Sequence, residues 1–137
     1  MLPTIRFINR FLPSYISSAF VLSLAKIPQI KPSLKERDIN ALASSTEFTF
    51  LGQDNKKRMA YSWGEGPLII LAHGWEGRAS QMAPIAQALA KQGFRAVAFD
   101  AKCHGQSEGR LMNFAGFQKD IQSISNHLDL PVHAYIA

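Results

Sequence analysis

Two short segments of the chain carry most of its chemically reactive side chains. The first is residues 73–78, His-Gly-Trp-Glu-Gly-Arg, and the second is residues 100–109, which contain an aspartate, a cysteine, a histidine and a serine. Side chains of these types supply proton acceptors and nucleophiles in enzymes, and histidine and cysteine also bind metal ions. Two histidines without carboxylate neighbours do not make a metal site, so these segments do not predict one.

Taken one by one, these side chains favour structural roles. Cys103 stands next to His104, but catalytic pairs meet in space, and neighbours in the sequence rarely face each other. Ser107 lies on a glycine-flanked loop without the strained strand-to-helix turn that exposes a nucleophilic serine. His73, His104 and Asp100 are therefore predicted to form structural hydrogen bonds.

Both segments follow runs of apolar residues that predict buried strands. Residues 68–72 and 96–99 are continuously apolar, and residues 132–137 form a third, mostly apolar run. Strands of a parallel sheet that are buried on both faces have this composition. Because parallel strands end at the same edge of a sheet, we expect the two reactive segments to meet at that edge, where open sheets bind ligands.

Helical patterns separate the three runs. One apolar stripe consists of Met82, Ile85, Ala86 and Leu89, and Gly93 follows it where a helix needs a left-handed residue. The other consists of Phe114, Phe117, Ile121, Ile124 and Leu128, and Asn113 precedes it as an expected N-cap. The alternation of strands and helices predicts right-handed crossovers and a parallel sheet.

The pattern before residue 64 is that of an antiparallel hairpin. A short helical segment at residues 34–43 leads into residues 47–51, which alternate polar and apolar side chains, and residues 58–63 return after a Gly-Gln-Asp-Asn turn. The predicted fold class is therefore α/β. It consists of an N-terminal antiparallel β-hairpin that leads into a mostly parallel sheet, incomplete at the C-terminus.

Residues 1–35 differ in charge from residues 36–137, and we treat the two as separate units. Five of the 15 basic residues and none of the 10 acidic residues precede Glu36, so the net charge of +5 belongs to the N-terminal unit. The rest of the chain is balanced in charge, which argues against a nucleic-acid-binding face and a nucleic-acid partner.

The N-terminal unit has apolar residues at near-helical spacing, which predicts a basic amphipathic helical segment. We favour packing of this segment on the domain. Peripheral contact with a membrane surface and a short cleaved signal remain open as alternatives. No run reaches the roughly 18 apolar residues that a membrane-spanning helix needs. The expected location is the cytoplasm, with or without membrane association.

The order and spacing of the motifs resemble the α/β-hydrolase superfamily. An apolar strand runs into His73-Gly74-Trp75, the next strand ends in Phe-Asp-Ala at residues 99–101, and His-Gly-x-Ser follows at residues 104–107. Trp-Gly-x-Gly-Pro at residues 63–67 narrows the resemblance to bacterial single-domain enzymes described as serine esterases or lipase-like. The resemblance covers residues 45–137.

This resemblance implies an oxyanion hole and a serine nucleophile, and it implies neither a metal nor an organic cofactor. The backbone N–H of Trp75 would be one oxyanion donor, and Gly74 and His73 would belong to the same loop. The family's Gly-x-Ser-x-Gly turn follows the strand that resembles residues 131–136, and Ala137 matches its first small residue. The nucleophile, acid and base are therefore not in this chain. The parent protein is expected to hydrolyse a carboxylic ester or a similar small acyl substrate, while the truncated 137-residue chain alone is expected to be inactive.

Lys102-Cys103 departs from the pattern, because relatives commonly have Pro-Gly at these positions. If the family glycine has a positive φ, Cys103 would be strained there. Two other hypotheses stay open. One is the same fold with dehalogenase, perhydrolase or lyase chemistry, and the other is a non-catalytic membrane-associated or binding protein anchored by residues 1–35.

Overall fold

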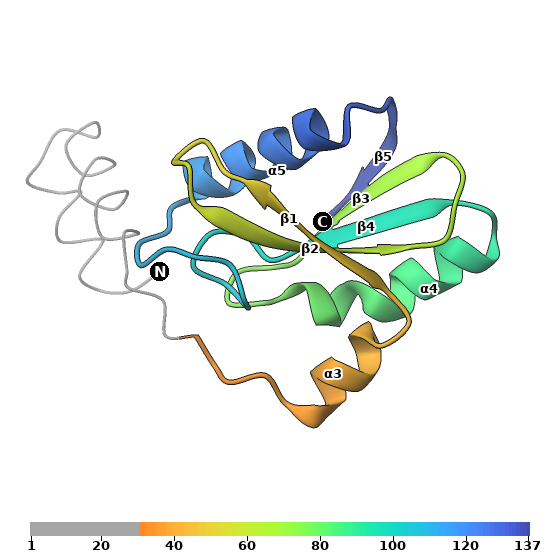
Figure 1. Cartoon of the computed structure of the whole chain (residues 1–137), viewed down its shortest axis with the longest axis horizontal. Helices are drawn as coiled ribbons and strands as arrows, with labels where there is room; N and C mark the ends of the chain where they lie inside the picture. The colour runs from red at the N-terminus through yellow and green to blue at the C-terminus, as the bar shows by residue number, and fades with distance from the viewer. Residues whose placement is uncertain (1–30) are drawn as a thin grey trace, which may run out of the picture.

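The apolar runs of the sequence form neighbouring strands of a five-stranded sheet. In the computed structural model, which describes residues 31–137, these strands are β3 (Leu68–Ala72), β4 (Arg95–Phe99) and β5 (Val132–Ile136). The sheet order is β1-β2-β4-β3-β5, with β3 parallel to both β4 and β5 (Figure 1). The parallel part of the sheet therefore forms as the sequence predicts.

The hairpin supplies the other two strands, β1 (Thr46–Leu51) and β2 (Lys57–Trp63). They pair antiparallel from Thr46 opposite Ser62 to Leu51 opposite Lys57, and β2 then pairs antiparallel with β4. At the turn, Asn55 adopts a φ of 56°, a left-handed conformation that asparagine accepts more readily than most residues. The predicted α/β fold class, a hairpin that leads into a mostly parallel sheet, is thereby confirmed.

Helices cover both faces of the sheet. Helix α5 (Phe114–Leu128) lies on one face, and α3 (Glu36–Leu42), the 3-10 turn η1 (Ala79–Met82) and α4 (Ala83–Lys91) lie on the other (Figure 1). Successive residues of β3 alternate between the two resulting cores, because side chains of a strand point to opposite faces. All five residues of β3 are buried for this reason.

The helix ends follow the local signals in the sequence. The Asn113 side chain accepts a hydrogen bond from the Gly116 N–H at 2.7 Å, and Gly93 has a φ of 85° just after α4. Two residues of the apolar stripes are not buried, since Ile85 is 43% exposed and Phe114 is 68% exposed. The spacing of apolar residues alone does not fix how wide the buried face of a helix is.

The predicted N-terminal helical segment, residues 1–35, falls outside the described residues except for 31–35, which are irregular. The described helices include none with the length and apolar character needed to cross a membrane.

Candidate active site at the carboxyl edge of the sheet

The loops after β3 and β4 meet at the edge where both strands end. Two hydrogen bonds cross between them in opposite directions. The Ala101 N–H donates to Nε2 of His73 at 3.0 Å, and the Ala79 N–H donates to Oδ1 of Asp100 at 2.7 Å. His73 follows β3 and Asp100 follows β4, and each side chain accepts a hydrogen bond from the backbone of the segment after the other strand. The two loops are therefore fixed relative to each other.

His73 uses both ring nitrogens in this unit. Because Nε2 accepts a hydrogen bond, Nδ1 carries the proton and donates to the Gly74 carbonyl at 2.8 Å. Burial disfavours the charged ring and lowers the pKa of His73 to about 4, helped by the nearby His104 and Arg78. The ring is therefore neutral at pH 7, and neither nitrogen is free to take a proton from a substrate.

Trp75 lies where the first loop reaches solvent. Among the hydrogen bonds of residues 31–137, none is donated by the Trp75 N–H, whereas the Gly77 N–H two residues later donates to the Gly74 carbonyl at 2.9 Å. The Trp75 ring is 38% exposed and packs 5.1 Å from the Phe114 ring, centroid to centroid. A Cβ added to Gly74 would meet no atom within 4 Å, so the space beside this backbone is open.

Asp100 organises the second loop. Its Oδ2 accepts from the Gln106 N–H at 2.9 Å, in addition to the bond from Ala79. Burial raises the pKa of Asp100, although both backbone donors favour the ionised form. Gly105 has a φ of 45°, and a Cβ there would overlap the Asp100 carboxylate, so only glycine fits the turn.

Ser107 and Cys103 are both buried and turned away from solvent. The Ser107 hydroxyl donates to the Asp100 carbonyl and accepts from the Met59 N–H at 2.8 Å. Cys103 has a φ of 67°, the left-handed conformation that its position in the motif suggested, and its side chain is packed in the core. Burial raises the pKa of the Cys103 thiol, so it stays protonated at neutral pH and is a poor nucleophile.

Within residues 31–137, His104 is the one residue whose side chain has a buried polar atom without a hydrogen-bond partner. Its Nδ1 lies 2.8 Å from the Lys102 carbonyl, so Nδ1 carries a proton. Its Nε2 is buried without a hydrogen-bond partner in the described part of the chain. The ring stands 5.0 Å from the His73 ring and 6.0 Å from the Trp75 ring.

Two buried ion pairs, which no sequence motif indicates, support these loops. Arg58 on β2 pairs with Asp120 on α5 at 3.0 Å, both almost fully buried, and the Lys102 N–H donates to Asp120 at 2.6 Å. Arg78 pairs with Asp38 of α3 at 3.4 Å. No local sequence signal identifies these partners, because 62 and 40 residues separate them.

Asp54 extends the first of these clusters toward solvent. It lies 2.9 Å from Nη2 of Arg58 and 2.9 Å from Nζ of Lys102. Burial alone would raise the pKa of Asp54, but the hydrogen bond from Lys102 and the charge of Arg58 outweigh it and lower the pKa to about 2. Asp54 is therefore ionised at neutral pH.

The geometry of this edge suits stabilisation of negative charge by a backbone N–H. Within residues 31–137, groups of three or more histidine, cysteine or acidic side chains that could hold a metal ion do not occur. The serine, cysteine and histidines that could act as nucleophile or base are instead buried or engaged in holding the loops.

Solved structures that share this fold include epoxide hydrolases and an esterase. An epoxide hydrolase from Vigna radiata superposes with a TM-score of 0.61 at 22% identity, over 68% of this chain and 30% of that one. An esterase from Exiguobacterium antarcticum gives 0.58 at 20% identity, over 63% and 33%. An epoxide hydrolase from an endophytic Streptomyces gives 0.59 at 20% identity, over 66% and 29%. The chain thus spans about a third of the length of these proteins, and at such identities the likeness establishes the fold.

The sequence itself matches a family of hydrolases. Residues 66–134, just over half of the chain, match the family described as serine aminopeptidase, S33. This match runs from the turn before β3 into β5 and includes both loops of the carboxyl edge. The chain therefore belongs to the S33 serine aminopeptidase family of α/β-hydrolases.

Proposed function

We propose that residues 1–137 are the N-terminal part of a serine hydrolase that acts on carboxylic esters or similar acyl compounds. The observation that carries this proposal is the Trp75 N–H, which lies at the carboxyl edge without an acceptor in the described chain. Acyl transfer builds negative charge on the carbonyl oxygen, and a fixed N–H aimed at that oxygen lowers the barrier. Trp75 is thus proposed as an oxyanion donor through its backbone.

His73 and Gly74 are proposed to position this donor. The two hydrogen bonds of the His73 ring fasten the start of the loop to the Gly74 carbonyl and to the backbone after β4. A neutral histidine whose two ring nitrogens both form hydrogen bonds is suited to holding the loop in place and is poorly suited to transferring a proton. The open space beside Gly74 lets a substrate carbonyl approach the backbone closely.

We place the nucleophile, the acid and the base outside residues 31–137. Ser107 and Cys103 are buried, and the oxygen of Ser107 is already engaged by two backbone groups. A polypeptide of these 137 residues is therefore expected to show no hydrolase turnover. Incubation with a chromogenic ester, and with a fluorophosphonate that labels activated serines, tests this directly. Turnover or stoichiometric labelling of residues 1–137 would contradict the assignment.

The oxyanion role is tested in a protein that joins these residues to the rest of the catalytic domain. Trp75→Pro removes the N–H, and Trp75→Phe is the matched control, since it keeps the N–H and an aromatic ring. Loss of one oxyanion donor lowers kcat about 10²- to 10³-fold. We expect that loss for Trp75→Pro relative to Trp75→Phe, with little difference in KM. Equal kcat values for the two variants would exclude Trp75 as a donor.

The nucleophile type is tested by the codons that follow Ala137. A small-x-Ser-x-Gly turn there supports a serine hydrolase and directs the screen to esters and aminoacyl anilides. An aspartate at the serine position would replace the proposed chemistry with that of a dehalogenase-like enzyme, while the oxyanion measurement on Trp75 would still stand on its own.

A further inference from the structure

A concave site lies at the amino ends of the parallel strands, at the opposite end of the sheet from the loops that contain Trp75. It is a groove of about 740 Å³ between the sheet and the end of α5, lined by Thr46, Phe48, Ser62, Gly64, Glu65, Gly66, Arg95, His127, Leu128 and Leu130. Arg95 begins β4 and Leu130 precedes β5, so the groove sits at the amino ends of the parallel strands. Its volume lies within the roughly 300–1,000 Å³ of small-molecule sites.

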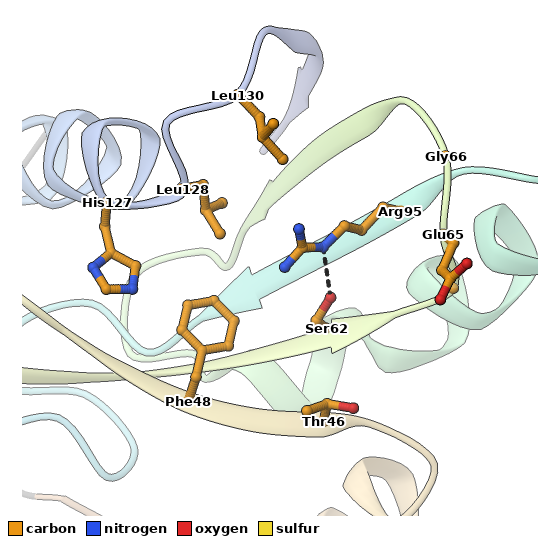
Figure 2. A pocket seen from close by; sticks show the side chains of 10 residues that line it. Thr46, Phe48, Ser62, Glu65, Gly66, Arg95, His127, Leu128 and Leu130 are labelled. Atoms are coloured by element: carbon orange, nitrogen blue, oxygen red, sulfur yellow. Dashed lines mark hydrogen bonds between the residues drawn. The ribbon is translucent and has the colours of Figure 1, made fainter.

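The Arg95 side chain lines this groove, and most of its N–H donors form no hydrogen bond within the described residues. Nε of Arg95 donates to the Ser62 hydroxyl at 3.1 Å, which fixes the plane of the guanidinium. In the described part of the chain no carboxylate lies within ion-pair distance of Arg95, and its Nη1 and Nη2 atoms donate no hydrogen bond. Figure 2 shows the guanidinium directed toward the space between Phe48 and Leu128, away from Glu65.

Three apolar side chains form part of the wall around the Arg95 side chain. Leu128 and Leu130 come from the end of α5 and the segment after it, and Phe48 faces them from β1 (Figure 2). The Phe48 ring is held in place by stacking on the His127 ring, with centroids 5.8 Å apart and planes 10° apart. A partly buried fork of N–H donors beside apolar walls matches a ligand with an anionic head and an apolar body.

The charges that line the groove indicate which anionic group of a ligand it can bind. Among the described residues that line the groove, Arg95 is the only arginine or lysine, and Glu65 contributes a carboxylate. A dianionic phosphate would meet one positive charge and one negative charge, whereas a carboxylate is neutralised by a single guanidinium in bidentate geometry. We propose that this groove binds a monocarboxylate with a short apolar chain or ring, at a site separate from the carboxyl edge that contains Trp75.

Octanoate is the probe for this site, and titration of residues 1–137 followed by amide and methyl NMR shifts is the assay. We expect shifts at Ser62, Leu128 and Leu130 and none at Trp75. 1-Octanol, which lacks the charge, should bind at least about ten-fold more weakly, because a hydrogen bond to a charged group is worth roughly a factor of ten or more. Acetate, which lacks the apolar chain, should also bind at least about ten-fold more weakly, because it buries almost no apolar surface against the leucine and phenylalanine walls.

Three variants separate the guanidinium from general effects of charge. Arg95→Gln should weaken octanoate binding about ten-fold or more, and Arg95→Lys should lie between it and the parent, since lysine keeps the charge but loses the fork. Arg110→Gln, at an exposed arginine outside the lining, is the matched control and should bind like the parent. Leu130→Glu changes a half-exposed wall residue without touching Arg95 and should also weaken binding.

The proposal is overturned if octanol binds as tightly as octanoate, or if both Arg95→Gln and Leu130→Glu leave the octanoate affinity unchanged. Shifts confined to the Trp75 edge would overturn it as well. None of these readouts uses catalysis, so they are independent of the proposed hydrolase function.

Discussion

The buried ion pair between Arg58 and Asp120 leads to a quantitative prediction about stability. Both side chains are at most 2% exposed, and Asp120 also accepts from the Lys102 N–H. Asp120→Ala leaves the guanidinium buried without its main partner. Removing one member of a buried pair costs about 3–5 kcal/mol. Asp54 still contacts Arg58 at 2.9 Å, so we expect the lower end, a loss of about 3 kcal/mol in the free energy of unfolding.

Urea unfolding followed by tryptophan fluorescence measures this loss, because Trp63 is buried on β2 and becomes exposed when the protein unfolds. The double variant Arg58→Met, Asp120→Leu removes both charges and should lose less stability than Asp120→Ala, since no buried charge is left unpaired. Glu65→Ala, at an exposed acidic residue outside the cluster, serves as the control for removing an acidic side chain. A loss below about 1 kcal/mol for Asp120→Ala, or a double variant less stable than the single one, would refute the reasoning.

Two further predictions concern the loops of the carboxyl edge. The folded pKa of His73 is about 4, below its usual 6.5, so the unfolded chain binds the extra proton first as pH falls. The free energy of unfolding should therefore decrease by a few kcal/mol between about pH 6.5 and pH 4, and His73→Gln should remove this part of the pH dependence; an unchanged pH profile would contradict it. Gly105→Ala forces a Cβ into the Asp100 carboxylate at a positive φ and should cost over about 1 kcal/mol, whereas Gly74→Ala meets open space. Equal melting temperatures for the two alanine variants would show that the Gly105 turn adapts.

The coupling of the two loops explains why so many of their side chains are unavailable for catalysis. A backbone donor is useful for charge stabilisation only if it is rigid, because a donor that must reorganise loses its advantage over water. Backbone N–H groups of the neighbouring loop or strand donate hydrogen bonds to the side chains of His73, Asp100 and Ser107. The reactive side chains that first draw attention in the sequence thus serve to fix backbone geometry.

The sequence by itself determined the strands, the hairpin, the helix ends and the edge at which the two loops meet. These features depend on local signals, such as the apolar run of residues 68–72, the N-cap Asn113 and the left-handed Gly93. The order of the His-Gly-Trp and His-Gly-x-Ser motifs also indicated the superfamily correctly. Local signals are readable because neighbours in the chain interact before any distant contact forms.

Only the tertiary structure decided which side chains are buried together and which atoms remain free. Ile85 and Phe114 sit within apolar stripes yet face solvent, while Arg58 is charged yet lies in the interior beside Asp120. The tautomer of His73 and the free donors of Arg95 likewise depend on partners 28 and 33 residues away. Burial and pairing are properties of packed surfaces, and a one-dimensional pattern does not specify which surfaces meet.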